Sequence, residues 1–213
     1  MGQRMTAKKK KNWDTLVASA AKLYLERDIE SVHLTDVAAD ASMGVATLYR
    51  YFDNKMNLTV LAAEQIIGSH MEPIIEDAET CLATLETGYD QVKALLHMFL
   101  RLQTEGIAVL RFIESFDRYV VSNDIDPDQL VTYEVKLRSL SSYVRRAIAN
   151  GISDGSIRPN LDVETFEFTI GRTIVHMSMK VSLFGKLLAG DEQVAPEAQI
   201  QLLIDMAMRY IEN

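Results

Sequence analysis

The sequence contains very little cysteine, and this excludes several kinds of site. Cys81 is the single cysteine among 213 residues, so an internal disulfide and a cysteine-based zinc site are both excluded. The remaining residues show no metal-ligand spacing. The chain also lacks a glycine-rich phosphate loop and a Gly-x-Ser-x-Gly elbow. We therefore expect a protein that is not an enzyme and that carries no metal and no cofactor.

Long apolar segments are missing as well. No uninterrupted apolar run approaches the ~20 residues of a membrane span. The lysine-rich start, MGQRMTAKKKKNWD, is not followed by the apolar segment of a secretory signal. These absences predict a cytoplasmic protein without a membrane partner. Translation could begin at Met1 or at Met5, and the sequence leaves this open.

Proline is scarce, and strand patterns are absent. Each of the four prolines can stand at a helix start, in a loop or at a kink, and no sustained apolar–polar alternation requires a strand. Apolar residues recur at helical spacing instead, so the predicted fold class is all-α. We expect helices at about 12–27, 34–41, 45–52 and from 55 to a kink or end near Pro73. Five more are expected within 88–103, 105–121, 126–152, 162–188 and 195–213.

Negative charge dominates the chain but is unevenly distributed. The formal net charge is −8, whereas residues 1–60 contain nine Lys/Arg and seven Asp/Glu and therefore carry +2. The rest of the chain carries −10, so only the first segment is expected to tolerate a polyanion. The run Lys8–Lys11 is typical of a solvated tail. Such an arm could add non-specific, salt-sensitive affinity for DNA.

The segment TDVAADASMGVATLYRYFDNKMNL, Thr35 to Leu58, predicts short helices joined by a tight turn. Two helices joined by a glycine-containing turn form a candidate helix-turn-helix. Leu48 and Phe52 make an inner i, i+4 pair on the second of these helices, so its tyrosines and arginine cannot all be buried with them. Exposed hydroxyl-tipped aromatics and an arginine suit contact with phosphates and base edges in a major groove.

Lys55 adds to this interpretation. A cation at a helix N-terminus opposes the helix macrodipole, and a bound phosphate would remove the conflict. The alternative is a small three-helix cap on a larger bundle, with tyrosines that simply face water. These residues alone do not decide between the two.

The stretch LTDVAADASMGVATLYRYFDNKMNL resembles the DNA-binding signature of the tetracycline-repressor (TetR) family of bacterial transcriptional regulators. The matching core is VAADA, TLYRYF and the following Lys55. The resemblance covers roughly residues 10–60 and returns in AIANGISDGSIRPNLDVE, which is similar to the family's segment between its seventh and eighth helices. It implies an N-terminal tail and three-helix helix-turn-helix DNA-binding domain at 1–54. A C-terminal helical bundle for effector binding and dimerisation would occupy 55–213.

The resemblance also implies which residues contact DNA. Positions that usually hold phosphates or base edges in the family correspond here to Thr47, Tyr49, Tyr51 and Lys55. Val45 and Ala46 stand where the family varies residues to read bases, and their methyl groups could contact a thymine methyl. Arg50 could read guanine or grip phosphate, and Thr35 occupies a second-helix position that sometimes reaches DNA.

Four residues depart from the family pattern. His33 stands where a threonine usually caps the second helix, and Asp28 replaces a glycine after the first helix. Ser42 replaces the usual turn glycine, and Gly44 replaces the serine that caps the recognition helix. Glycine is an acceptable N-cap, but a hydroxyl that could touch phosphate is lost. These departures could weaken or re-tune DNA binding.

The second half of the chain carries more apolar residues than a DNA-binding unit requires. In the family this region binds a small effector and forms the homodimer, through two helices that correspond here to about 162–188 and 196–211. Small residues beside aliphatic ones permit close helix approach, although a plain core helix would look the same. The expected dimerisation residues are Gly171, Ile174, Ser178, Val181, Leu203 and Met206.

Aromatic, histidine and methionine residues in this half are candidates for an effector pocket. Such linings suit an apolar or aromatic ligand, although each residue could equally serve core packing. His97 and His176 stand out because a polar group among apolar neighbours needs a partner. The candidate ligand-binding residues are His97, Phe112, Phe116, Tyr119, Tyr143, His176 and Met177.

These expectations combine into an all-α, homodimeric, TetR-like regulator of transcription. We expect a repressor that binds a near-palindromic double-stranded operator and is released by a small effector. The alternative is an α-helical dimer that binds a small molecule or a protein, and whose DNA affinity is weak or lost.

Overall fold

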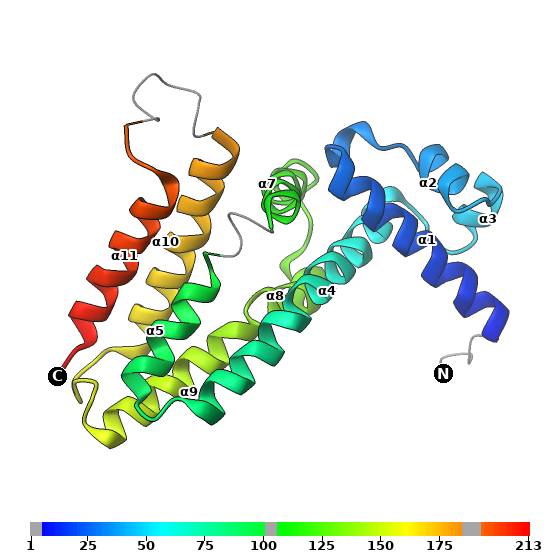
Figure 1. Cartoon of the computed structure of the whole chain (residues 1–213). Coiled ribbons are helices and arrows are strands. Elements are labelled where there is room, and N and C mark those ends of the chain that lie inside the picture. The colour runs from blue at the N-terminus through cyan, green and yellow to red at the C-terminus, as the bar shows by residue number, and fades with distance from the viewer. Residues whose placement is uncertain (1–5, 101–105, 185–192) are drawn as a thin grey trace. The chain divides into compact units, whose positions relative to one another are not determined.

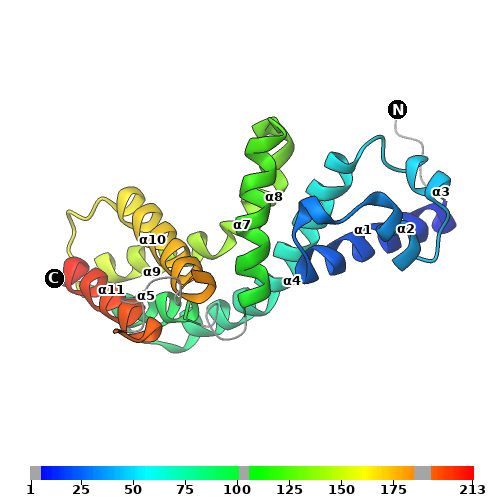
Figure 2. The same cartoon turned by 90° about the horizontal axis from the view of Figure 1, so that it is seen from above.

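The computed structural model describes residues 6–100, 106–184 and 193–213 (Figures 1 and 2). These residues form helices, with one isolated β-bridge between Ile157 and Glu212 and no strand, so the all-α prediction is confirmed. The possible starts at Met1 and Met5 lie outside the described residues. The α-helices are α1 (Ala7–Glu26), α2 (Leu34–Asp40), α3 (Val45–Tyr49), α4 (Lys55–Thr84), α5 (Gly88–Met98), α7 (Ile107–Ser122), α8 (Val131–Leu137), α9 (Ser139–Asp154), α10 (Val163–Phe184) and α11 (Pro196–Ile211). Two 3-10 helices are η1 (Ile29–Ser31) and η2 (Pro127–Leu130).

The chain divides into two compact units. Residues 1–69 and 112–136 form the first unit, and residues 70–111 and 137–213 form the second. Helices α4 and α7 each contribute to both. The division predicted after residue 54 falls inside the first unit, and as a functional boundary it stays a prediction.

Helix α1 begins earlier than expected, at Ala7 rather than near Asn12. The hydroxyl of Thr6 accepts a hydrogen bond from the amide of Lys9 at 3.4 Å, which caps the helix. The run Lys8–Lys11 therefore lies in the first two turns of α1, and the prediction of a tail was wrong. Lysine is a good helix former, so a capping threonine before the run is enough to start a helix.

Helix α4 runs through Pro73 to Thr84, so the helix end considered at Pro73 is wrong. Asn54 caps the helix as its side-chain oxygen accepts from the amide of Asn57 at 2.9 Å. Proline has no N–H, and the amide that would donate to the carbonyl of Ser69 is therefore missing.

The segment expected as one helix over 126–152 is interrupted. It forms η2, α8 and α9, and Arg138 at the junction has a ψ of 11° instead of a helical value. Helix α9 ends at Gly155, whose φ of +81° is the left-handed conformation common at helix C-termini.

In the second unit, α5 and α9 approach each other closely at two glycines. A Cβ on Gly88 would overlap the backbone nitrogen and Cα of Gly151, so a larger residue has no room there. Asp154 accepts from the Gly88 amide at 2.8 Å, and Ser156 Oγ accepts from the Tyr89 amide at 3.1 Å. The turn after α9 thus binds the start of α5, and it fixes how the two helices pack. Cys81 is buried in the same core.

Candidate nucleic-acid interface

The turn between α2 and α3 has the geometry of a helix C-cap without a glycine. The Met43 amide donates to Ala38 O at 2.8 Å, and the Ser42 amide donates to Ala39 O at 3.0 Å. This pair of bonds is the Schellman motif, which requires a left-handed residue at its centre. Ser42 adopts that conformation with a φ of 53°. Because its Cβ crowds the backbone there, the turn is strained relative to one with glycine.

The two short helices are capped differently from the family pattern. The Asp36 carboxylate accepts from the His33 amide at 3.0 Å, so the α2 N-terminus is held by the third residue of the helix. Gly44 is the N-cap of α3 and supplies no side-chain bond. Its φ of −71° is ordinary, and a Cβ built on it would meet nothing within 4 Å. The structure therefore leaves room for a serine at this position.

Helix α3 has five residues, fewer than the eight predicted. The chain continues as a turn, in which the amides of Tyr51 and Phe52 both donate to Leu48 O. Leu48 and Phe52 are buried as the predicted inner pair. The ring centroids of Phe52 and Trp13 are 6.1 Å apart, which anchors the end of this turn against α1.

The opposite side of α3 is open to solvent. Tyr49 is 54% exposed, and Ala46 and Arg50 are also exposed. The Arg50 guanidinium donates to the Thr47 hydroxyl at 3.2 Å, which orders both side chains on one face. The remaining predicted contact residues of this segment include the exposed Thr35 on α2, the half-buried Val45 on α3 and the half-buried Tyr51 in the turn after α3.

Lys55 is directed into the first unit. Its Nζ donates to Ile29 O at 2.6 Å and lies 5.8 Å from the centre of the Tyr119 ring. Burial lowers the pKa of Lys55, whereas the charges of Glu30 and Asp28 act in the opposite direction. One of the three N–H donors of this ammonium group is therefore used within the chain.

Helix α7 binds the segment that follows α1 through a hydrogen bond and an ion pair. The Ile29 amide donates to Ser115 Oγ at 3.1 Å, and Arg118 pairs with Asp28 at 2.6 Å and with Glu114 at 3.2 Å. Asp28 also caps η1 by accepting from the Glu30 amide. These contacts could not be predicted from the sequence, because residues about 90 positions apart carry no local signal that they interact.

The predicted effector residues are split between the two units. Phe112, Phe116 and Tyr119 are buried in the first unit, where Phe116 packs on Tyr133 with ring centroids 4.7 Å apart. The second unit contains the other four. There, His97 hydrogen-bonds to Lys93 O at 2.6 Å and to Gln201 Oε1 at 3.1 Å. The Tyr143 hydroxyl donates to Glu79. His176 is exposed and hydrogen-bonds to Arg172 O, and Met177 is half-buried. The effector site itself stays a prediction.

The predicted dimerisation residues also differ in accessibility. Ile174 and Ser178 are fully buried inside the second unit, so they are not part of an exposed surface. Met206 is 62% exposed, and Gly171, Val181 and Leu203 are half-buried. On α11 the exposed apolar residues recur every fourth position, at Leu202, Met206 and Tyr210.

Two further features of the described residues bear on function. None of their helices combines the length and apolar character that crossing a membrane requires. They also contain no group of three or more His, Cys, Asp or Glu placed to hold a metal ion.

Residues 16–60 match the family described as bacterial regulatory proteins, tetR family. Over these residues the chain is similar to the DNA-binding region of this family. The match begins in the middle of α1 and ends in the first turns of α4, so it contains the whole α2–α3 unit. An HTH-type transcriptional regulator of Staphylococcus aureus is 25% identical over 109 residues. That alignment spans 50% of this chain and 55% of the relative, about half the length of each.

Solved structures similar to this chain have the same fold along most of its length. A protein from Saccharomonospora viridis, described as a transcriptional regulator and bound to choline, superposes with a TM-score of 0.70 at 18% identity. The superposition covers 96% of this chain and 99% of the other. The regulator FadR from Bacillus subtilis, in complex with stearoyl-CoA, gives a TM-score of 0.64 at 16% identity, with 94% and 100% covered. At these identities the likeness concerns the fold alone.

Proposed function

We propose that this protein is a DNA-binding regulator of transcription of the TetR family, a repressor that a small effector releases from its operator. The observation that carries the proposal is the open face of α3, where Tyr49, Arg50 and Ala46 stand clear of the core behind a Schellman turn. A short recognition helix is sufficient, because only its first turns reach base edges. Such a regulator acts where bacterial DNA lies, in the cytoplasm.

The proposed DNA contacts follow from position and exposure. Tyr49, Arg50 and Ala46 would meet the groove most directly, and Thr47 and Thr35 would hold phosphates. The half-buried Val45 and Tyr51 would contribute an edge of their side chains. Lys55 is predicted as a phosphate contact by resemblance, but its bond to Ile29 O makes it a weaker candidate than the others.

We infer a homodimer from the outer face of α11. Leu202, Met206 and Tyr210 form an apolar row one helical turn apart, and a second copy of the chain would remove this row from water. The half-buried Gly171, on neighbouring α10, would allow close approach of helices. In a dimer on a near-palindromic operator, the two recognition helices would lie ~34–36 Å apart.

The effector is proposed to be a small, apolar or aromatic molecule. Choline and stearoyl-CoA bound to the two similar structures support a small-molecule response in proteins of this fold. An effector that binds better to a dimer with the wrong spacing of recognition helices shifts the population off DNA. A spacing that is identical in effector-free and effector-bound dimers would contradict this mechanism.

The first test is selection of duplexes from a random library by the full-length protein, followed by anisotropy binding to an enriched duplex. Tyr49→Ala should weaken binding to that duplex about tenfold or more, since one good base contact contributes ~1–3 kcal/mol. Tyr49→Phe keeps the ring, and it separates a loss of the hydroxyl from a loss of stacking area. Val121→Ala, at an 82% exposed site of the first unit, is the control and should change nothing.

The second candidate function is a helical dimer that binds a small molecule or a protein, with little DNA affinity. Two observations favour it: Gly44 offers no hydroxyl to a phosphate, and Lys55 is turned inward. Under this candidate the library yields no enriched sequence, while the dimer and its melting temperature are intact.

A further inference from the structure

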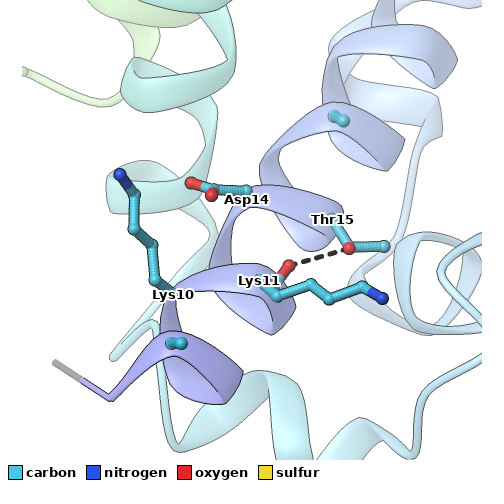
Figure 3. A pocket seen from close by; sticks show the side chains of 6 residues that line it. Lys10, Lys11, Asp14 and Thr15 are labelled. Carbon is cyan, nitrogen blue, oxygen red and sulfur yellow. Dashed lines mark hydrogen bonds between the residues drawn. The ribbon is translucent and has the colours of Figure 1, made fainter.

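The first two turns of α1 carry a dense group of cations. Lys8, Lys9, Lys10 and Lys11 are consecutive and all are exposed. Successive helical residues are rotated by about 100°, so the four ammonium groups fan around the start of the helix. Figure 3 shows Lys10 and Lys11 extending to opposite sides of α1.

Most other cations in residues 6–60 are already engaged. Lys22 pairs with Asp40 at 2.6 Å, Arg27 lies 3.8 Å from Asp36, and Lys55 donates to Ile29 O. Arg50 donates to a neutral hydroxyl and keeps its charge available. In this described stretch, the lysine run and Arg50 are therefore the cations that remain free to meet an anionic partner.

The helix macrodipole does not favour the lysine run. Cations in the first turn oppose the macrodipole, and this turn of α1 contains no acidic residue to offset them. Asp14 is the nearest acidic side chain along the helix, one turn after Lys10, and no ion pair joins it to the run. The charges of the run are therefore not neutralised within the first turn of α1.

The side chains beside the lysines are small enough for a large partner to approach α1 closely. Lys10 and Lys11 extend to either side of an open strip of α1 that also carries Asp14 and the small side chains of Ala7, Thr15 and Ala18, and this strip forms a shallow hollow of about 540 Å³ (Figure 3). Lys9 and Lys10 precede Trp13 by four and three residues and are therefore its neighbours on the surface of α1. Trp13 packs against Phe52 at the end of the α3 turn, so this part of the lysine run lies near the segment that carries α3.

We propose that the lysine run, Lys8–Lys11, is the main DNA-backbone contact of this protein and that Lys55 is a positioning residue. The proposal rests on the proposed function and adds a second contact surface to it. The partner is the phosphate backbone of duplex DNA, which is bound without regard to sequence. Lys55 joins η1 to α4 through Ile29 O, and it thereby holds the α3 turn in place.

The salt dependence of binding separates the two roles. Each lysine that neutralises a phosphate adds about 0.9 to the slope of log affinity against log salt. Because the four side chains fan out, about two per subunit can face one duplex. Losing two contacts lowers the slope by about 2 per subunit, whereas losing a positioning residue lowers affinity equally at every salt concentration.

The experiment measures affinity of the full-length protein for a short labelled duplex of random sequence between about 50 and 200 mM salt. The variants are K8Q/K9Q/K10Q/K11Q and the charge-keeping K8R/K9R/K10R/K11R. The double variant K10Q/K11Q is matched in charge by K93Q/R146Q, at exposed positions of the second unit. Circular dichroism melting verifies that each variant is folded.

The expected result is a reduced slope for the glutamine variants and a normal slope for the arginine and K93Q/R146Q variants. Equal slopes for wild type and the quadruple glutamine variant would overturn the proposal, as would an equal fall in K93Q/R146Q. Lys55→Met should weaken binding without changing the slope, and a slope lowered by about 1 would assign Lys55 to a phosphate instead.

The failure of this proposal is distinguishable from failure of the proposed function. A library that yields no enriched duplex contradicts sequence-specific regulation, while the random-sequence duplex still reports on the lysines. Enrichment with an unchanged slope contradicts only the role of the lysine run.

Discussion

The two units of this protein use glycine in opposite ways. In the second unit, Gly88 and Gly151 stand where α5 and α9 leave no space for a side chain, and Gly155 supplies the left-handed residue that ends α9. In the first unit, Ser42 adopts the left-handed conformation without glycine, and Gly44 occupies a site with open space around it. The second unit thus has glycine where its backbone geometry requires one, whereas the first unit has serine at its left-handed position and glycine at a position that does not require it.

This difference in the use of glycine reflects how each unit is held together. Close helix contact fixes one arrangement of the bundle, so packing there tolerates no added atom. The first unit combines an apolar core, which includes Leu48 and Phe52, with polar contacts such as that of Arg118 with Asp28. Exposed ion pairs contribute little individually, so we expect substitutions at exposed positions of this unit to have small effects on folding.

The largest expected effect follows from filling the glycine contact. Gly88→Ala places a methyl group on the backbone of Gly151, which cannot move without separating α5 from α9. We expect a loss of at least ~3 kcal/mol in the free energy of unfolding, at the upper end of overpacking effects. Thermal or urea unfolding of the full chain measures it.

Gly44→Ala is the matched control for that substitution. Its Cβ meets nothing within 4 Å, so the loss should stay below ~1 kcal/mol. Similar losses for the two alanine variants would remove the contrast between the units.

A smaller effect, of opposite sign, is expected at the strained turn. Ser42→Gly relieves the crowding at a φ of 53°, and the greater freedom of glycine in the unfolded chain offsets part of the gain. We expect ~0.5–1 kcal/mol of stabilisation of the first unit, seen as a higher melting temperature. Ser42→Ala keeps the Cβ and should give no gain, and Gly155→Ala should destabilise the second unit because its φ is +81°.

The smallest effect is a pH dependence at Asp28. Burial raises its pKa, but the Glu30 amide and the charge of Arg118 outweigh this, and the net pKa lies below the ordinary value. A carboxylate with a lowered folded pKa stabilises the fold above its unfolded pKa of ~3.9, and this contribution is lost as pH falls below that value. Since both partners are largely exposed, we expect a few tenths of a kcal/mol.

Unfolding of wild type and Asp28→Asn between about pH 6 and pH 3 measures this term. The stability difference between them should be present at pH 6 and should shrink toward pH 3. A difference that grows on acidification would show that Asp28 does not act through its charge.

Local patterns predicted much of the α2–α3 segment correctly. The inner pair Leu48 and Phe52 and the tight turn before α3 both depend on residues within a few positions of one another. Such signals are readable because helix spacing and capping are short-range effects. The start of α1 was misjudged because charge was given more weight than the helix propensity of lysine.

Contacts between distant segments could not be predicted in this way. Lys55 looks like an exposed helix start in sequence, and only the fold shows Ile29 O and Tyr119 beside it. Ile174 sits on the buried side of α10, although its neighbours are compatible with a dimer face. The helical period fixes which residues share a face, and it leaves open what covers that face.

Helix α4 passes from the first unit to the second between Ser69 and His70. The proline at position 73 removes the one backbone hydrogen bond that would end on Ser69. Over its 30 residues, α4 therefore has a local gap in its ladder of backbone hydrogen bonds where it passes from one unit to the other. A helix resists bending less at such a gap than in its regular turns.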